Sequence, residues 1–251
     1  MINVIMHGCN GRMGQVISEL VKNEEDMQIV AGIDVVDNIQ NDYPVFTDID
    51  KCDVAADVVI DFSSAKAIDK LIAFCEKNNL PVVLCSTGLS EEQIYAVSDL
   101  SKKVAVLRSG NMSLGINTVI KVLKSISKQL ADAGFDIEIV EKHHNQKLDA
   151  PSGTALMLAD SINEQLNCEY DYKYDRSSVR EKRPKKEIGI SAVRGGTIVG
   201  DHDIIFAGTD EVIEIKHRAY SRKIFANGAI NAAKFLSGKE AGMYDMSDVL
   251  G

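Results

Sequence analysis

A glycine-rich turn near the start of the chain constrains the fold more than any other feature. Residues 2–8 (INVIMHG) predict a short buried strand, and the amphipathic residues 11–23 that follow predict a helix. The junction between them has the sequence Gly8-Cys9-Asn10-Gly11-Arg12-Met13-Gly14. Glycines at such a junction permit a tight turn and let a pyrophosphate approach the backbone at the amino end of the helix. The segment therefore predicts the first strand, turn and helix of a parallel α/β sheet.

An acidic residue follows at the distance expected of a dinucleotide site. The second apolar strand, residues 27–33, is followed by Asp34, twenty residues after Gly14. A carboxylate here accepts hydrogen bonds from an adenosine ribose. It repels a 2′-phosphate, and Val35 supplies no positive charge to offset it. We therefore expect NADH to be preferred or accepted, while use of NADPH stays open because Arg12 can reach a phosphate.

The glycine spacing departs from the usual G-x-G-x-x-G pattern. The chain has G-x-x-G-x-x-G, so Cys9 stands at the place of the first glycine, and Asn10 is expected to tolerate a left-handed turn. An alternative is that the glycines only close a strand-to-helix turn and that Asp34 is an exposed carboxylate at a strand end. The combination of strand, helix and acid favours dinucleotide binding over that alternative.

The order of apolar segments predicts two domains. Strands and helices alternate through residues 1–112, which predicts a Rossmann-like parallel-sheet cofactor domain. Its ligand loops should lie at the carboxyl edge of the sheet. Strands outnumber helices in residues 113–221, which predicts a second, α+β domain with an antiparallel or mixed sheet. Residues 222–251 contain a helix and a loose tail that are expected to return to the first domain.

Composition excludes several classes of function. The 251 residues include 28 basic and 37 acidic side chains, so a net charge of −9 argues against general binding of nucleic acid or anionic membrane. The five cysteines contain no C-x-x-C pair, so no disulfide framework or metal site is predicted and a cytoplasmic location is expected. No run reaches the roughly 18 apolar residues of a membrane helix. Residues 173–186 carry seven basic side chains, which predict a solvated loop or, less favoured, a field that attracts substrate.

The second domain contains a cluster of titratable residues between an apolar strand and a helix predicted to begin near Pro151, with that proline in its first turn. The cluster comprises His143, His144 and Lys147. Histidine titrates near neutrality and lysine can donate a proton, which suits acid catalysis beside a reduced cofactor. Residues 152–154 present backbone amides and a hydroxyl that can hold a carboxylate. The alternative is that the histidines cap or pack and that the lysine is solvated.

The segment EIVEKHHNQKLDAPSGTA, residues 138–155, resembles the signature of the bacterial dihydrodipicolinate reductase family, also called 4-hydroxy-tetrahydrodipicolinate reductase. Other blocks resemble that family in the same order over nearly the whole chain, namely GCNGRMG at 8–14, IDFS at 60–63, CSTG at 85–88, NMSLG at 111–115, VRGGTIVGDH at 193–202, FANGA at 225–229 and LSGKE at 236–240. The resemblance implies an oxidoreductase that uses NADH or NADPH to reduce a cyclic imine dicarboxylate in the diaminopimelate route of lysine biosynthesis. It also implies a cytoplasmic homotetramer whose second domain binds substrate and forms the oligomer interface.

The resemblance implies roles for individual residues. It gives His143 an acid/base role, makes Lys147 the proton donor, and implies that substrate is held by His144, Gly153 and Thr154. It places the cofactor against Gly8, Cys9, Asn10, Gly11, Arg12, Met13, Asp34, Cys85, Ser86, Thr87, Ser109, Gly110, Asn111 and Met112. The chain departs from the common family pattern at Cys85 and Met112, which stand where Gly and Phe are frequent. No metal ligand is implied.

Two other functions stay open at this point. A reductase of a different imine or ketone would keep the glycine turn but would not need the H-H-x-x-K and P-S-G-T-A segments. A module that senses NADH without chemistry would need neither His143 nor Lys147. Both segments are present, which favours the dicarboxylate reductase.

Overall fold

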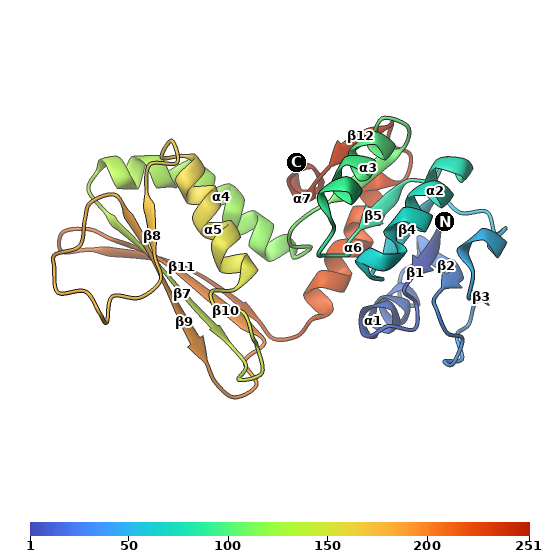
Figure 1. Cartoon of the computed structure of the whole chain (residues 1–251), viewed down its shortest axis with the longest axis horizontal. Helices are drawn as coiled ribbons and strands as arrows, with labels where there is room; N and C mark the ends of the chain where they lie inside the picture. Colours follow the sequence, from blue (N-terminus) through green and yellow to red (C-terminus); the bar gives the residue numbers. More distant parts are fainter. The chain divides into compact units, whose positions relative to one another are not determined.

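The computed structural model describes all 251 residues, and the chain forms two compact units (Figure 1). Unit 1 comprises Met1–Leu114 and Lys223–Gly251, and unit 2 comprises Gly115–Arg222. The unit boundaries therefore fall after residues 114 and 222, where the sequence suggested 112 and 221. None of the helices combines the length and the apolar composition that crossing a bilayer requires.

Unit 1 is built on a seven-stranded sheet in which all neighbouring strands are parallel, in the order β12-β6-β5-β4-β1-β2-β3. The strands are β1 (Ile2–His7), β2 (Met27–Ile33), β3 (Val45–Phe46), β4 (Val58–Asp61), β5 (Val82–Leu84), β6 (Ala105–Arg108) and β12 (Gly242–Tyr244). The strand order reverses between β1 and β4, and open α/β sheets bind ligands beyond the carboxyl ends of the strands at such a point. The predicted Rossmann-like sheet is confirmed.

Helices cover both faces of this sheet because both faces are apolar. On β1, Val4 and Met6 face one layer of the core while Ile5 faces the other, and all three are fully buried. The first layer contains α1 (Arg12–Val21), α6 (Lys223–Leu236) and α7 (Met246–Leu250). The second contains α2 (Ile68–Asn78) and α3 (Glu91–Ser101), and short 3₁₀ turns lie at Ile49–Lys51 and Ala65–Ala67.

The carboxyl-terminal segment extends the sheet of unit 1. Helix α6 packs in its core, and β12 pairs in parallel with β6. The prediction of a loose tail was wrong because β12 is only three residues long, too short for a periodic signal, and its pairing partner is remote in sequence. The Tyr244 ring meets the Phe235 ring edge to face at 5.7 Å, which fixes the strand to α6.

Unit 2 is a five-stranded mixed sheet, in the order β11-β10-β7-β9-β8, with two helices on one face. Its elements are α4 (Leu114–Asp132), β7 (Asp136–His143), α5 (Gly153–Glu164), β8 (Asp171–Lys173), β9 (Glu187–Arg194), β10 (Gly200–Ala207) and β11 (Val212–Ala219). Strand β10 is antiparallel to both β7 and β11, whereas β9 is parallel to β7 and β8. The core contains Ile137 and Ile139 of β7 together with Leu123 of α4 and Leu158 of α5.

A glycine in the FANGA block lets α6 touch a loop of unit 1. A Cβ atom on Gly228 would lie 1.6 Å from the carbonyl oxygen of Met112. Only glycine therefore permits this approach of helix and backbone. Met112 itself is buried in the same core layer as α6.

We predict that Gly228→Ala destabilises the protein. In an open helix this change stabilises by about 1 kcal/mol, because alanine has the higher helix propensity. Here the methyl group collides with Met112, so we expect a loss of about 1–3 kcal/mol or more in the free energy of unfolding, measured by chemical denaturation.

The matched control is Asn227→Ala, at the neighbouring exposed position of the same helix. Its free energy of unfolding should stay within about 0.5 kcal/mol of the wild type. A Gly228→Ala protein that is as stable as the wild type would contradict the close packing.

Candidate active site

The glycine turn and Asp34 line one pocket at the carboxyl edge of the sheet in unit 1. The pocket has a volume of about 370 Å³, and Gly8, Asn10 and Gly11 contribute to it. Residues 62–64, in the loop after β4, also line it and were not assigned to the site from the sequence. No lysine or arginine lines the pocket.

Glycine is required at two points of the turn. Gly8 has a φ of +81°, and a Cβ atom there would lie 2.6 Å from the carbonyl oxygen of Phe62. A Cβ atom on Gly14 would lie 2.2 Å from the carbonyl oxygen of Gly8, so glycine lets α1 pack directly on the turn. The prediction that Asn10 tolerates a left-handed turn was wrong, because the left-handed residue is Gly8.

Cys9 points into the core and not into the pocket. Its side chain is fully buried, and Gly32 of β2 leaves the space that its sulfur fills, since a Cβ atom there would lie 2.6 Å from Cys9 Sγ. Burial, with the nearby charge of Asp34, raises the pKa of the Cys9 thiol to about 12. Met13 also packs against the core, whereas Arg12 is exposed. Cys9 can therefore serve a ligand only through its backbone.

The Asp34 carboxylate is held in place by the turn that it faces. Asp34 Oδ2 accepts a hydrogen bond from the Asn10 amide at 2.8 Å, and Oδ1 accepts one from the Val35 amide at 2.7 Å. Asn10 Nδ2 in turn donates to the Val36 carbonyl at 2.6 Å. Each carboxylate oxygen keeps a lone pair for a further donor. A glycine cradle beside an oriented carboxylate fits the diphosphate and ribose of an adenine dinucleotide.

The other two predicted cofactor blocks follow neighbouring strands of the same sheet. Residues 85–87 follow β5 and residues 109–112 follow β6, so both lie at the edge that carries the glycine turn. Neither block lines the Asp34 pocket. Cys85 and Met112 pack against the core, and Ser109 Oγ donates to the Asn111 carbonyl at 3.0 Å. The structure thus gathers Gly8, Asn10, Gly11 and Asp34 in one pocket and places the two blocks along the same edge.

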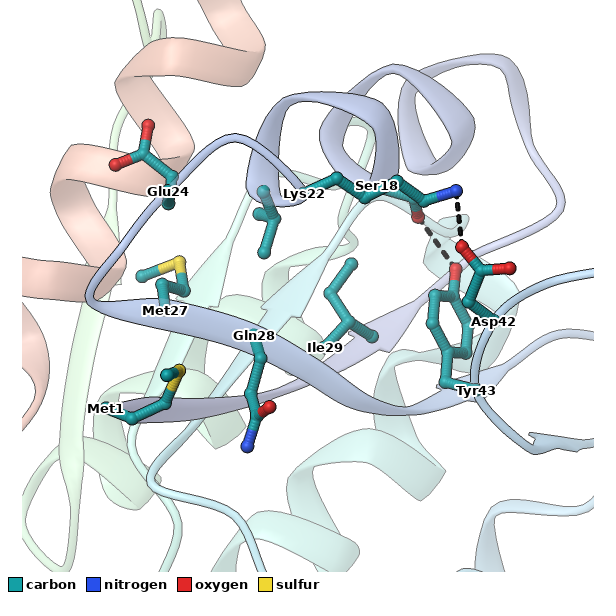
Figure 2. A pocket seen from close by; sticks show the side chains of 10 residues that line it. Met1, Ser18, Lys22, Glu24, Met27, Gln28, Ile29, Asp42 and Tyr43 are labelled. Atoms are coloured by element: carbon teal, nitrogen blue, oxygen red, sulfur yellow. Dashed lines mark hydrogen bonds and ion pairs between the residues drawn. The ribbon is translucent and has the colours of Figure 1, made fainter.

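A second pocket in unit 1, of about 290 Å³, lies at the other edge of the sheet (Figure 2). Met1 and Met27, at the amino ends of β1 and β2, contribute to its lining. Ser18 Oγ and Tyr43 Oη share a hydrogen bond of 2.7 Å on one side of it. Ligands of open α/β sheets bind at the carboxyl edge, so the Asp34 pocket is the candidate cofactor site.

A buried histidine–carboxylate pair joins the two strands at the switch point. His7 Nδ1 lies 2.8 Å from Asp61 Oδ1, and the Asp61 side chain is completely buried. Burial alone would raise the pKa of Asp61, but hydrogen bonds from His7 and Ser63 hold it below its usual value. His7 and Ser63 also line the Asp34 pocket, so this pair fixes part of the pocket wall.

In unit 2 the inner face of β7 changes from apolar to polar along the strand. Ile137 and Ile139 are fully buried, and the same alternation places Glu141 and His143 on the buried face. Strand β7 ends at His143, so His144 lies beyond the regular alternation.

Glu141 is completely buried and accepts four hydrogen bonds. His143 Nδ1 and Arg194 Nη1 approach its Oε2 at 2.6 and 2.7 Å. Arg194 Nη2 and the Ser152 amide donate to its Oε1 at 2.7 and 3.0 Å. Burial alone would raise the pKa of Glu141, but the hydrogen bonds from Arg194 and His143 hold it below its usual value. Glu141 is therefore a carboxylate, which can only accept, so His143 Nδ1 carries a proton.

Ser152 caps the helix that was predicted to bind a carboxylate. Its Oγ accepts from the Ala155 amide at 3.1 Å, and α5 begins at Gly153. The prediction that Pro151 lies in the first turn was wrong: Pro151 follows a cis peptide bond and precedes the capping residue. Gly153 is exposed and Thr154 half-buried, so the first turn of α5 is open to a ligand at Gly153.

His202 of β10 lies beside His143. The two rings meet edge to face, with their centroids 5.3 Å apart, and His202 Nε2 lies 3.0 Å from Ser152 Oγ. Burial, with the nearby charge of His143, lowers the pKa of His202 to about 4. His202 is therefore neutral at pH 7.

Lys147 lies in a loop that packs on the turn between β9 and β10. Its Nζ is 2.9 Å from Asp149 Oδ1, and its amide donates to the His144 carbonyl at 3.2 Å. The hydrogen bond from Lys147 lowers the pKa of Asp149. The Asn145 amide donates to the Gly196 carbonyl at 3.2 Å, which holds the loop to the turn. Hydrogen bonds thus join His143 to the start of α5, and Lys147 follows in the adjoining loop.

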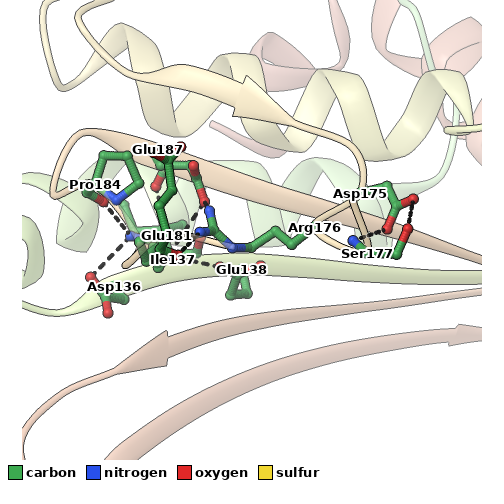
Figure 3. Close-up of polar contacts among 10 residues, drawn as sticks. Asp136, Ile137, Glu138, Asp175, Arg176, Ser177, Glu181, Pro184 and Glu187 are labelled. Atoms are coloured by element: carbon green, nitrogen blue, oxygen red, sulfur yellow. Dashed lines mark hydrogen bonds and ion pairs between the residues drawn. The ribbon is translucent and has the colours of Figure 1, made fainter. Parts of the chain in front are cut away.

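Two arginines of the basic stretch 173–186 belong to a structural network (Figure 3). Arg183 Nε donates to Glu138 Oε1 at 2.9 Å, and its Nη2 donates to one backbone carbonyl of β7 and one of β9. Arg176 pairs with the buried Glu187 at 2.6 Å. Neither a solvated loop nor a field that attracts substrate describes these two residues. Their partners lie on strands of the sheet, which the local charge pattern does not reveal.

Three residues of the cluster were not predicted from the sequence, namely Glu141, Arg194 and His202. The alternation of Ile137 and Ile139, continued by two residues, would have placed Glu141 on the buried face. Arg194 and His202 join the cluster because β9 and β10 flank β7, and that pairing has no local signal.

A parallel-sheet unit with a dinucleotide turn, joined to a unit with a histidine–carboxylate cluster, defines an NAD(P)-dependent oxidoreductase of two domains. Family descriptions match both parts of the chain: "Dihydrodipicolinate reductase, N-terminus" over residues 2–112 and "Dihydrodipicolinate reductase, C-terminus" over residues 115–250. The chain belongs to the dihydrodipicolinate reductase family.

Individual relatives agree over the full length. The chain is 52% identical over 250 residues to a 4-hydroxy-tetrahydrodipicolinate reductase of Caldanaerobacter subterraneus subsp. tengcongensis, with 100% of this chain and 98% of the relative covered. It is 50% identical to that of Clostridium novyi, with the same coverage. A solved dipicolinate-bound dihydrodipicolinate reductase from Paenisporosarcina sp. TG-14 is 27% identical, with a TM-score of 0.81 and with 98% of this chain and 97% of that chain covered. These matches confirm the resemblance found in the sequence.

The low pKa of His202 predicts a loss of stability in acid. Histidine titrates near 6.5 in an unfolded chain and His202 at about 4 in the folded one. Between these values the unfolded chain binds more protons, so the free energy of unfolding falls as the pH falls. From pH 7 to pH 5, His202 should account for about 2 kcal/mol of that fall.

The measurement is urea unfolding of the wild type and of His202→Gln at both pH values. Glutamine keeps a polar group beside Ser152 but does not titrate. We expect the variant to lose about 2 kcal/mol less stability than the wild type between pH 7 and pH 5. Equal losses in the two proteins would show that His202 is not held neutral.

Proposed function

We propose that this chain catalyses the NAD(P)H-dependent reduction of 4-hydroxy-tetrahydrodipicolinate, a cyclic imine dicarboxylate, to tetrahydrodipicolinate in the diaminopimelate route of lysine biosynthesis. The observation that carries the proposal is the cluster in unit 2, where Glu141 joins His143 to the start of α5 and Lys147 lies in the adjoining loop. This cluster occurs in a chain whose full length matches reductases of that name.

The proposed roles follow from charge and position. The bound nicotinamide supplies a hydride. Lys147 donates a proton, and the 4-hydroxyl group leaves as water, so that hydride, proton and loss of water together give tetrahydrodipicolinate. His143 acts as an acid/base with Nε2 as its exchanging nitrogen. Lys147 is paired in the structure with the exposed Asp149, which holds its positive charge near the start of α5. A substrate carboxylate can replace Asp149 as the partner of Lys147.

The substrate carboxylates are proposed to bind at the amino end of α5 and beside His144. The first amides of a helix have no partner within the helix, and the helix dipole adds a partial positive charge at this end. Gly153 is exposed, and a Cβ atom there would meet no atom within 4 Å, so space for a ligand exists at the first residue of the helix. Gly153 and Thr154 therefore supply the proposed anion site.

NADH is proposed as the preferred cofactor, with NADPH as an alternative. The Asp34 carboxylate is fixed by two amides at the edge of the pocket, and the lining contains no lysine or arginine to offset its charge. A 2′-phosphate beside Asp34 would be repelled, whereas ribose hydroxyls can donate to it. The proposed contacts are Gly8, Cys9, Asn10, Gly11, Arg12, Met13, Asp34, Cys85, Ser86, Thr87, Ser109, Gly110, Asn111 and Met112.

A homotetramer assembled through unit 2 is also proposed, in the cytoplasm. Three apolar side chains on the sheet of unit 2 are exposed, namely Val193 at 45%, Val212 at 58% and Ile213 at 37%. Apolar side chains exposed on a sheet favour a contact with another protein surface. The five free cysteines suit a reducing compartment.

The first test follows oxidation of NADH and NADPH by the purified protein, with substrate formed in place from pyruvate and aspartate semialdehyde by the preceding synthase. We expect rapid oxidation that depends on the synthase. We expect Lys147→Ala to lower kcat by about 10²- to 10⁴-fold while the Kd for NADH stays within about twofold.

Lys185→Ala, at an exposed position of the basic stretch, is the control and should keep wild-type kcat. Loss of NADH binding in parallel with kcat would contradict the role of Lys147. An absence of oxidation with both cofactors bound would favour a reductase of another imine or ketone, or an NADH-sensing module.

Asp34→Ala tests the proposed cofactor preference. Loss of the carboxylate removes acceptors for the ribose hydroxyls and removes the repulsion of a 2′-phosphate. We expect the Kd for NADH to rise by about tenfold, which corresponds to a loss of roughly 1.4 kcal/mol of binding free energy. The Kd for NADPH should rise less or fall. Asp53→Ala, an exposed carboxylate outside the pocket, is the control. An unchanged ratio of the two Kd values would remove Asp34 from the ribose site.

A further inference from the structure

We infer that Glu141 is the positioning residue of the active site: it fixes the tautomer of His143 and ties that histidine to the helix end proposed to bind the substrate carboxylate. The inference rests on the proposed function of His143. The family resemblance assigned no role to Glu141. Glu141 does not need to touch substrate to act in this way, because it acts through His143 and Ser152.

The contacts of Glu141 come from three separate elements. His143 lies on the same strand two residues later, Arg194 ends β9, and Ser152 precedes α5. Both carboxylate oxygens are used, since each accepts from Arg194 and each has one further donor. A carboxylate with two donors on each oxygen is fixed in one orientation. It therefore also fixes the positions of His143, Arg194 and the Ser152 amide.

The tautomer of His143 follows from the charge on Glu141. Because the carboxylate cannot donate, the proton of neutral His143 must lie on Nδ1, and Nε2 is the nitrogen left to exchange a proton. Arg194 is the reason why Glu141 keeps its charge when completely buried, since its guanidinium meets both oxygens. Without that pairing a buried carboxyl would be protonated and could donate to Nδ1 instead.

The surroundings leave the imidazole of His143 little freedom. A Cβ atom on Gly200 of β10 would lie only 3.1 Å from His143 Nε2, so a side chain there would crowd the ring. The ring of His202 lies against it edge to face. The titratable or charged groups that face His143 are Glu141 on β7, Arg194 on β9 and His202 on β10, and His202 is neutral at pH 7. Removal of the negative charge of Glu141 leaves only positive or neutral neighbours.

Glu141 also links the histidine to the proposed carboxylate site. The Ser152 amide donates to Glu141, and the Ser152 side chain caps the helix that begins at Gly153. A change at Glu141 should therefore alter both the proton transfer at His143 and the binding of the dicarboxylate. A role confined to packing would alter neither tautomer nor pH profile.

The test compares Glu141→Gln with Glu138→Gln. Glutamine can still accept from Ser152, but its amide group can donate to His143 Nδ1, which moves the proton of His143 to Nε2. We expect kcat to fall by about 10- to 100-fold and KM for the dicarboxylate to rise. We also expect one limb of the pH profile of kcat to shift relative to the wild type, because the negative charge beside His143 is lost. In ¹⁵N-histidine-labelled protein, the His143 signals should change from the Nδ1–H to the Nε2–H pattern.

Glu138→Gln is a matched control because Glu138 lies on the same strand and also pairs with an arginine, Arg183, outside the cluster. It should leave kcat, the pH profile and the His143 signals as in the wild type. Glu141→Asp keeps the charge and should keep the Nδ1–H pattern and the position of the pH limb, at a lower kcat.

The half-buried Arg194 loses its charged partner in Glu141→Gln, so the single variant can fail to fold. The double variant Glu141→Gln with Arg194→Met removes both charges and should show the same change of tautomer and of pH profile. A folded variant with the wild-type tautomer and pH profile overturns the inference. Failure of the proposed function is seen separately with His143→Gln, which would then keep wild-type kcat. The His143 NMR signals of the wild type and of the Glu141 variants still report whether Glu141 sets the tautomer.

Discussion

The constraint on which the rest of the structure depends is that a buried charge must be paired. Each unit places a completely buried carboxylate within hydrogen-bond distance of a histidine: Asp61 with His7 in unit 1 and Glu141 with His143 in unit 2. An unpaired carboxylate at either position would be too costly to bury, so the partners are held in fixed positions. His7, the partner of Asp61, belongs to the wall of the Asp34 pocket. His143, the partner of Glu141, is the proposed acid/base.

Glycines provide the close approaches that bring remote segments to these sites. Gly8 and Gly14 let the first turn lie against the loop after β4 and against α1, and Gly228 lets α6 lie on Met112. Gly200 leaves room for the imidazole of His143. At Gly8, Gly14 and Gly228 a side chain would collide with the backbone, and at Gly200 it would crowd the imidazole. Gly8, Gly200 and Gly228 thus mark contacts between segments that are far apart in the sequence, whereas Gly14 serves a contact within its own turn.

Much of the site could be predicted where the signal is local. The strand, turn and helix around Gly8 and the distance to Asp34 are properties of one short segment, and the structure brings them into one pocket. Predictions failed where a distant contact decides. In the glycine turn, the left-handed residue is Gly8 and not Asn10, because the turn packs against Phe62. In the basic stretch, Arg176 and Arg183 are paired because β9 and β7 offer carboxylates.

The sequence by itself determined the alternation of elements, the face of each strand that is buried, and the linear segments that bear the chemistry, because periodicity and spacing are written along the chain. Only the tertiary structure decided which residues become neighbours. Arg194 and His202 meet His143 through the pairing and register of β9, β7 and β10, and β12 exists only because β6 offers an edge. Strand pairing joins residues of any separation, so no local pattern encodes it.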